Sequence, residues 1–242
     1  DGLIYAVAND SKNQIRVLNM DGENLFPEGK YGESSIDEST TVVNESVFID
    51  ICVDENGIIY ALDRNSGHIY VYTSEGDALV VFGGLGDVRG EFNLPVALDS
   101  NSNGEIFVLD AANGAIHKFM PTSYMNNLKE AYLMFRDGEY DKSADICSSI
   151  LSVNNNSFFI NTLIGRIEYK RKNYDAAMSY FKQAGNRAQY AKAFSEYRHN
   201  IFREYFVWVI LAIVAVFAVV LSVIVILRKK ANKIVDDYYS GG

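Results

Sequence analysis

Cysteine, tryptophan and proline are scarce in this sequence of 242 residues, which holds two cysteines, one tryptophan and three prolines. Cys52 and Cys147 lie far apart within apolar stretches, which favours two buried thiols over a disulfide or a metal pair. The sequence also lacks Ser-His-Asp spacing, paired cysteines and HExxH. We therefore expect a protein that is not an enzyme, with no catalytic residues, no cofactor and no metal site in these residues.

Basic residues are few in the first half of the chain. Residues 1–121 carry 20 acidic and 6 basic side chains, a balance of −14, whereas residues 122–242 carry 11 acidic and 16 basic ones, a balance of +5. Because phosphate binding needs a cationic face, the acidic half argues against nucleic acid as a partner.

Charge is absent from residues 206–227, a run of 22 residues that is apolar apart from Ser222. As a helix this run would measure about 33 Å, enough to cross a bilayer core, whereas a buried helix of a soluble protein would show a polar face. Basic residues follow at 228–230, and aromatic residues mark the other boundary. The positive-inside rule therefore predicts a single-pass plasma-membrane protein with residues 1–205 outside the cell and residues 228–242 as a short cytoplasmic tail.

The expected membrane helix also carries small side chains three to four residues apart, at Ala212, Ala215, Ala218 and Ser222. Such a face lets helices pack closely in lipid, so it could contact other membrane proteins. A single membrane helix that packs against no other protein explains these small side chains equally well. An outside domain usually follows a signal peptide, and this chain opens on Asp1 without one, so we expect further sequence upstream.

Three related units recur in the first half. They begin "GLIYAVAND" at Gly2, "GIIYALDRN" at Gly57 and "GEIFVLDAA" at Gly104, 55 and 47 residues apart. Each has a short apolar strand, a turn of Asn, Asp, Ser or Gly, and a second alternating strand. A further strand, "FIDICVD" or "PVALDS", precedes the second and third units. This spacing falls within reach of a propeller blade, which takes about 40–50 residues.

The units resemble the NHL repeat, a blade of a β-propeller, in "FNLPVALDSNSNGEIFVLD" through "NGAIHKF" and in "FGGLGDVRGEF" just ahead. The resemblance implies a partial propeller of about three blades over residues 1–121. It also gives Gly83, Gly84, Gly86 and Gly90 the role of inter-blade turns. A phosphate loop would need a helix and usually a Lys-Ser or Lys-Thr pair, and neither follows. Because propellers close with about 4–8 blades, we expect more blades upstream and a strand that completes the last one.

Some propellers of this kind are metal-dependent lactonases or lyases, with carboxylates, amides or histidines around a central channel. The candidates here are His68, His117, Asp54, Asp63, Asp99 and Asp110. The histidines occupy different positions in the aligned repeats, and the aspartates stand at strand ends where turns need caps, so we expect structural roles. The acidic residues 28–46 read as a solvated surface insertion rather than a calcium loop, because the D-x-D-x-D-G pattern is missing.

After Pro121 the apolar period changes from 2 to 3.6 residues, which predicts helices over residues 122–205. The segments from Asn126 and from Ile160 align with an offset of 34 residues and resemble the tetratricopeptide repeat. Small residues at Ala131, Gly165, Ser143 and Ala177 should let paired helices approach. The core of these repeats is expected at Phe135, Tyr140, Tyr169, Tyr174 and Phe181. An aromatic stripe at Tyr190, Phe194, Tyr197, Ile201 and Tyr205 should cap the last repeat and run directly into the membrane helix.

The expected fold is therefore multidomain β + α: a partial propeller over 1–121, tetratricopeptide-like repeats over 122–205, a transmembrane helix over 206–227 and a tail over 228–242. The order resembles NHL-repeat proteins of Gram-positive bacteria, whose genes often accompany carbohydrate ABC importers. The resemblance implies an extracellular, membrane-anchored scaffold on the bacterial cell surface, acting as an accessory subunit of such an importer, with membrane proteins and carbohydrate as partners. The alternative is an extracellular propeller enzyme or a sugar-binding receptor whose site lies in upstream blades.

Overall fold

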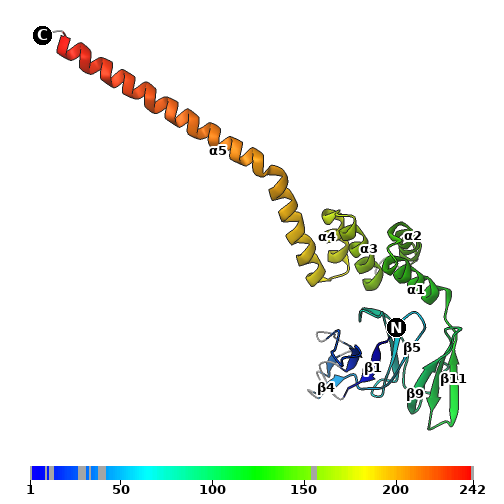
Figure 1. Cartoon of the computed structure of the whole chain (residues 1–242). Helices are drawn as coiled ribbons and strands as arrows, with labels where there is room; N and C mark the ends of the chain where they lie inside the picture. The colour runs from blue at the N-terminus through cyan, green and yellow to red at the C-terminus, as the bar shows by residue number, and fades with distance from the viewer. Residues whose placement is uncertain are drawn as a thin grey trace.

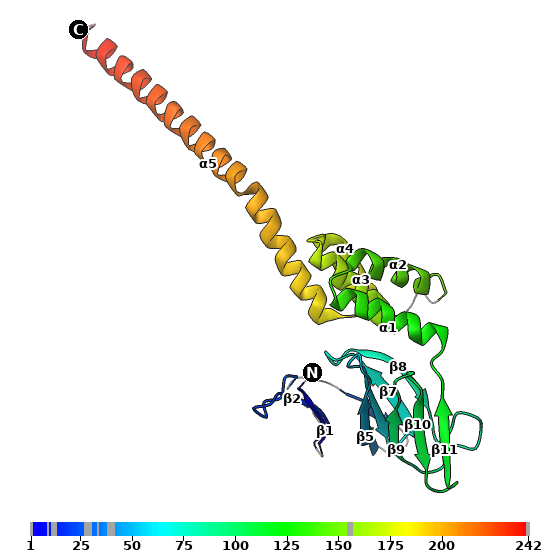
Figure 2. The same cartoon turned by 45° about the vertical axis from the view of Figure 1, so that its right-hand side comes forward.

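The computed structural model describes residues 2–8, 10, 14–26, 31–32, 34–37, 42–153 and 157–240, without the side chains of residues 34–37, 42–44 and 233–240. Antiparallel sheets form one end of the molecule, and four short helices lie beside them (Figure 1). A fifth, much longer helix projects away from both (Figures 1 and 2).

The strands form short antiparallel sheets. They are β1 (Ile4–Val7), β2 (Ile15–Leu18), β3 (Ser34–Asp37), β4 (Val42–Glu45), β5 (Phe48–Val53), β6 (Ile59–Asp63), β7 (His68–Tyr72), β8 (Ala78–Gly83), β9 (Pro95–Ser100), β10 (Ile106–Asp110) and β11 (Ala115–Phe119). Strands β5, β6, β7 and β8 follow one another in a four-stranded sheet, and β9, β10 and β11 form a three-stranded one. Strands β1 and β2 pair with each other, as do β3 and β4. The antiparallel sheets expected from the repeats are confirmed, and the hairpin of β3 and β4 lies where the sequence indicated only a solvated insertion.

Strand β6 is buried on both faces, which explains why its sequence is apolar up to its last residue. Ile59 belongs to a cluster with Ile15 of β2, whereas Tyr60 belongs to a larger cluster with Val108 of β10. Successive side chains of a strand point to opposite faces, so the four-stranded sheet lies between the β1–β2 pair and the three-stranded sheet. The larger cluster continues through Leu128 of α1 into the helices, and the core therefore crosses from sheets to helices.

The described part of the chain contains no closed ring of sheets, and within it β11 pairs with β10 alone. The three-stranded sheet thus has one strand fewer than its neighbour. Its inner strand is held to the neighbouring sheet by a hydrogen bond from the Leu98 backbone N–H to Asp50 Oδ2, at 2.8 Å.

Four helices form two antiparallel hairpins: α1 (Ser123–Arg136) with α2 (Tyr140–Leu151), and α3 (Phe158–Lys170) with α4 (Tyr174–Gln183). The helices of each pair approach closely at small residues. Ser143 Oγ donates to the Ala131 carbonyl at 2.7 Å, and a Cβ on Gly165 would lie 2.6 Å from Phe181 Cε1. Thr122 and Ser157 begin α1 and α3 as N-caps, each accepting a backbone N–H with its hydroxyl.

Helix α5 (Arg187–Ser240) has two parts that meet at a visible bend (Figure 2). The first part packs on α4 through Ala193 and Tyr197. The expected stripe is wrong in part, because Tyr190, Phe194 and Ile201 are exposed. The packing side is rotated toward Ala193, which is fully buried against α4.

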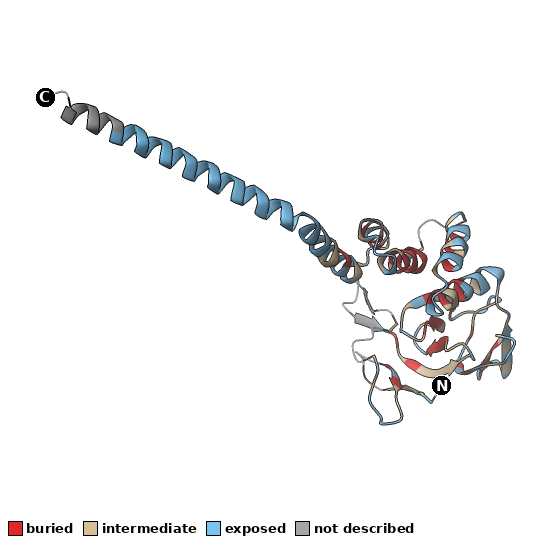
Figure 3. Ribbon diagram, turned by 45° about the horizontal axis from the view of Figure 1, so that its top comes forward, coloured by how far each residue is buried: buried red, intermediate tan, exposed pale blue. Residues whose placement is uncertain are grey.

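The second part of α5 is exposed along its whole described length (Figure 3). One helix of the described chain, over residues 187–232, is long and apolar enough to span a membrane, with a mean hydropathy of 3.5 in its most apolar window. No helix-breaking Gly or Pro separates the two parts, and α5 is assigned as one continuous helix from Arg187 to Ser240.

Candidate functional site at the junction of sheets and helices

The aspartates that align between repeats cap turns. Asp63 Oδ1 accepts the backbone N–H of Val47 and of Asn65, each at 2.9 Å. Asp110 accepts the backbone N–H of Leu94 at 3.0 Å in the same way. Both carboxylates are buried. Burial alone would raise the pKa of Asp110, but hydrogen bonds from backbone and side-chain N–H groups lower it. These side chains are fully engaged in holding the strand that precedes their own.

The other candidates for chemistry do not converge. Asp99 accepts the Ser100 backbone N–H and is exposed. His68 packs edge-on against Tyr70 in the four-stranded sheet, whereas His117 lies in the three-stranded sheet with Nε2 at 3.6 Å from Asp110 Oδ2. Among the described residues, no group of three or more His, Cys, Asp or Glu side chains is placed to hold a metal ion.

Gly83 ends β8, and the other three glycines lie between β8 and β9, where the chain passes from one sheet to the next. Their φ angles are +82° at Gly83, +154° at Gly84 and Gly86, and +96° at Gly90. Gly83 also lies close to the ring of Phe92, since a Cβ added to Gly83 would be 3.0 Å from Phe92 Cε2. The connector folds back on itself, with Phe92 N–H donating to the Gly84 carbonyl at 2.9 Å, and β9 rather than a helix follows it.

A buried ion pair joins α1 to the four-stranded sheet. Lys129 Nζ lies 2.9 Å from Asp54 Oδ2, and their side chains are 11% and 5% exposed. The ammonium also lies 5.2 Å from the centre of the Tyr60 ring. Burial alone would lower the pKa of Lys129, but hydrogen bonds to Tyr60 and Asp54 raise it. Asp54 Oδ1 meanwhile accepts the Ile58 backbone N–H at 3.0 Å, so a single carboxylate caps its turn and binds the helix.

The same helix makes two further polar contacts with the turns at this end of the sheet. The hydroxyls of Tyr132 and Ser74 lie 2.7 Å apart. Arg136 donates from Nη1 to the Asn56 carbonyl at 2.8 Å. Both turns, between β5 and β6 and between β7 and β8, therefore contact α1.

Helix α3 reaches the second of these turns through Arg166. Its Nη1 lies 2.7 Å from Asp77 Oδ2, and its Nη2 pairs with Glu75. The guanidinium also stacks 5.0 Å from the centre of the Phe135 ring of α1. Burial raises the pKa of Asp77, while the Arg166 charge opposes that rise. The junction thus brings cations of α1 and α3 onto acidic turns of the sheet.

Sequence reasoning did not identify this junction. The available signal was the opposite charge balance of the two halves, which we had interpreted only as evidence against nucleic acid. The sides of α1 and α3 that carry Lys129 and Arg166 face these turns. In this protein they bind the chain's own sheet.

The residues expected in the helical core have different environments. Phe135 and Phe181 are buried. Tyr140 packs on the larger cluster with its ring 5.6 Å from that of Phe135, and Tyr169 and Tyr174 contact each other at 5.4 Å near the surface.

The small residues of the apolar helix, Ala212, Ala215, Ala218 and Ser222, are all exposed, and Ser222 Oγ donates to the Ala218 carbonyl at 2.9 Å. The two thiols are free, and burial raises the pKa of Cys52 and of Cys147 to about 12.

Comparisons with known proteins leave the family open. No protein-family model matches the chain, and no curated protein matches it. Solved structures that match include a streptogramin B lyase, at 12% sequence identity and a TM-score of 0.24. That match covers 51% of this chain and 56% of the lyase chain, so this chain spans little more than half the length of that protein. A TM-score this low does not identify a common fold, and the architecture rests on the strands and helices themselves.

Proposed function

We propose that this chain is a membrane-anchored extracellular scaffold that holds other membrane proteins, as an accessory subunit of a carbohydrate importer of the ABC type. The observation that carries the proposal is the continuity of α5. One helix begins against α4 and continues through the apolar segment. A helix has a fixed rise of about 1.5 Å per residue, so it would set the height of the folded part above a bilayer.

The junction extends this rigid path to the sheets. The Lys129–Asp54 pair is buried, and Arg166 binds two carboxylates of a second turn. We infer that these paired charges fix the geometry of the junction, because charge-assisted hydrogen bonds add geometric specificity. The sheets are thus attached to α1 and α3, and these helices are attached through α4 to α5. This arrangement favours a scaffold over a sheet domain on a flexible tether.

The proposed family assignments fit this arrangement. The four-stranded sheet has the strand number of a propeller blade, and the hairpins have the order and the small-residue contacts of tetratricopeptide repeats. Because α1 and α3 bind the sheet, we place partner contacts on the sheets, on the outer sides of α2 and α4, and on the membrane face of α5. The basic residues 228–230 place the C-terminus in the cytoplasm in this proposal.

The test is native mass spectrometry of the full-length protein extracted gently from its membrane. The proposal expects importer subunits in a fixed ratio. A variant with Gly-Ser-Gly-Ser-Gly inserted between His199 and Asn200 interrupts α5 between its two parts and should lose those subunits. The same five residues added after Gly242 serve as the control and should retain them. Recovery of the protein alone, or equal recovery of partners with both insertions, would contradict the scaffold.

A further inference from the structure

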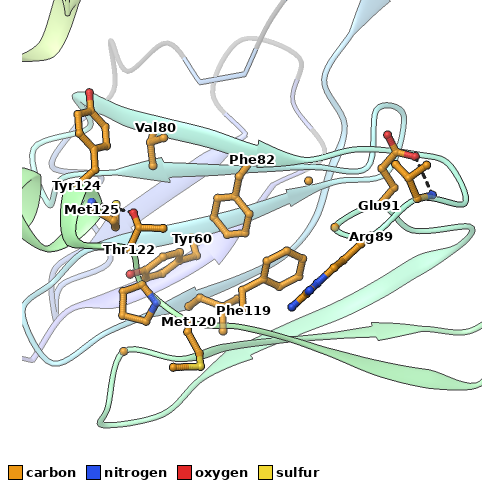
Figure 4. Close-up of a pocket in the computed structure, with 16 residues that line it drawn as sticks. Tyr60, Val80, Phe82, Arg89, Glu91, Phe119, Met120, Thr122, Tyr124 and Met125 are labelled. Atoms are coloured by element: carbon orange, nitrogen blue, oxygen red, sulfur yellow. Dashed lines mark hydrogen bonds between the residues drawn. The ribbon is translucent and has the colours of Figure 1, made fainter. Parts of the chain in front are cut away.

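A cavity of about 490 Å³ lies between the two larger sheets and the start of α1. Its lining includes Val80 and Phe82 of β8, Ile106 of β10 and Phe119 of β11. Its volume lies within the range of about 300–1,000 Å³ that small-molecule sites occupy. Figure 4 shows an elongated arrangement, with Tyr124 toward one end and Arg89 toward the other.

The body of the cavity is apolar and aromatic. The rings of Phe82 and Phe119 touch, with centroids 5.2 Å apart, and form a continuous wall beside Tyr60 (Figure 4). Met120 and Met125 line the end nearer α1. Methionine side chains adapt to ligands of different shape, whereas aromatic rings give firm walls. This surface suits a hydrocarbon or aromatic group.

The polar groups within the body are already engaged. The Tyr60 hydroxyl lies 3.5 Å from Asp54 Oδ2 and bonds Lys129, and the Thr122 hydroxyl accepts the Met125 backbone N–H at 3.2 Å. A sugar bound here would bury several hydroxyl groups with few hydrogen-bond partners, and each unpaired buried hydroxyl weakens binding. The lining therefore disfavours carbohydrate at this cavity.

The end of the cavity away from α1 carries a positive charge, on Arg89 of the connector between β8 and β9. In the described part of the chain Arg89 has no ion-pair partner, although Glu91 lines the same end. Glu91 is turned to its own loop, where Oε2 accepts the Val88 backbone N–H at 3.3 Å. Figure 4 shows the Arg89 side chain directed back toward Phe119. An arginine fork matches a carboxylate with two parallel hydrogen bonds.

We propose that this cavity binds an elongated apolar monocarboxylate, with the carboxylate on Arg89 and the apolar body along the wall formed by Phe82, Phe119 and Tyr60. Charge complementarity selects an anion, and the lining selects the apolar body. The ligand contacts both larger sheets and the first turn of α1, so it joins the same parts as the polar junction. This site is independent of the scaffold function, since it needs no partner protein.

Calorimetric titration of the full chain in lipid nanodiscs tests the proposal, with empty nanodiscs as the blank. The probes are 4-phenylbutyrate, 4-phenylbutan-1-ol and 4-phenylbutylamine, which share an apolar body and differ in charge. We expect 4-phenylbutyrate to bind with a Kd of about 1 mM or tighter and the other two at least about tenfold more weakly. Equal affinity for all three, or binding of none, would overturn the assignment.

Two variants locate the site. Arg89→Gln should weaken 4-phenylbutyrate binding about tenfold or more, because it removes a charge-assisted pair. Arg64→Gln is the matched control, since Arg64 is exposed and outside the cavity, and it should change nothing. Met120→Trp alters an exposed rim residue, narrows the cavity and should weaken binding with Arg89 intact. Wild-type affinity in both Arg89→Gln and Met120→Trp would refute the site.

Discussion

Replacing Lys129 with methionine should loosen the attachment of α1 to the four-stranded sheet. The variant keeps most of the side-chain length and removes the ammonium, so the Asp54 carboxylate stays buried without its cation. Both partners are almost inaccessible, at 11% and 5% side-chain exposure. Breaking a buried pair by removing one partner costs about 3–5 kcal/mol, whereas exposed pairs contribute about 0–1 kcal/mol. We take about 3 kcal/mol, the lower end, because Asp54 keeps its two backbone hydrogen bonds.

Native-state hydrogen exchange measured by mass spectrometry is the assay, because it reports local opening in the full chain. A loss of about 3 kcal/mol should speed exchange in α1 and in the turn after β5 by about 100-fold. Lys118→Met is the control. This variant removes an ion pair of the same 2.9 Å length, between Lys118 and Glu105, in which the lysine side chain is 49% exposed. In Lys118→Met, α1 should exchange as in the wild type.

The double variant Lys129→Met with Asp54→Asn separates the pair from other effects. The asparagine carbonyl can still accept the N–H groups of the turn, and no unpaired charge remains. We expect a coupling of about 2 kcal/mol between the two positions. If α1 exchanges no faster in Lys129→Met than in Lys118→Met, or if the coupling is below about 0.5 kcal/mol, the pair does not hold the junction.

Three further predictions concern single side chains. Gly165→Ala should lower the free energy of unfolding by about 1 kcal/mol in thermal melts, because overpacking against Phe181 costs about 1–3 kcal/mol and the gain in helix propensity returns about 1. Cys52 and Cys147 should resist iodoacetamide at pH 8 in the folded protein and react in urea, as followed by mass spectrometry, because a pKa of about 12 leaves almost no thiolate. Asp110→Asn should destabilise the protein at pH 7 and less so at pH 3 in denaturant unfolding. The folded-state pKa of Asp110 is lowered, so its stabilisation is present above the unfolded pKa of about 3.9 and is lost as the pH falls through the folded value.

Each of these has an outcome that would contradict it. A higher melting temperature for Gly165→Ala would mean that the Phe181 ring moves aside freely. Alkylation of either thiol at the same rate in folded and unfolded protein would show that burial does not protect it. An Asp110→Asn variant that loses as much stability at pH 3 as at pH 7 would place the loss in shape rather than in charge.

The local pattern of the sequence determined the elements. Apolar alternation with Asn, Asp and Gly turns indicated the strands from β5 to β7, and the change to a 3.6-residue period indicated the hairpins. The uncharged run at residues 206–227 indicated the long apolar helix. These features depend on neighbours within a few residues, so one sequence suffices to read them. The same local reading explains the aspartate caps, because Asp63 stabilises a turn beside its own strand.

Contacts between distant segments could not be read in this way. Lys129 and Asp54 are 75 residues apart, and only the packing of α1 on the ends of two turns makes one ion pair of them. The stripe on α5 was misassigned for the same reason, since the position of α4 decides which side of the helix is buried. The cavity at Arg89 likewise draws on β8, β10, β11 and α1. Periodicity fixes which side chains share a face, but the identity of the opposing surface depends on long-range packing, and tertiary structure alone decides it.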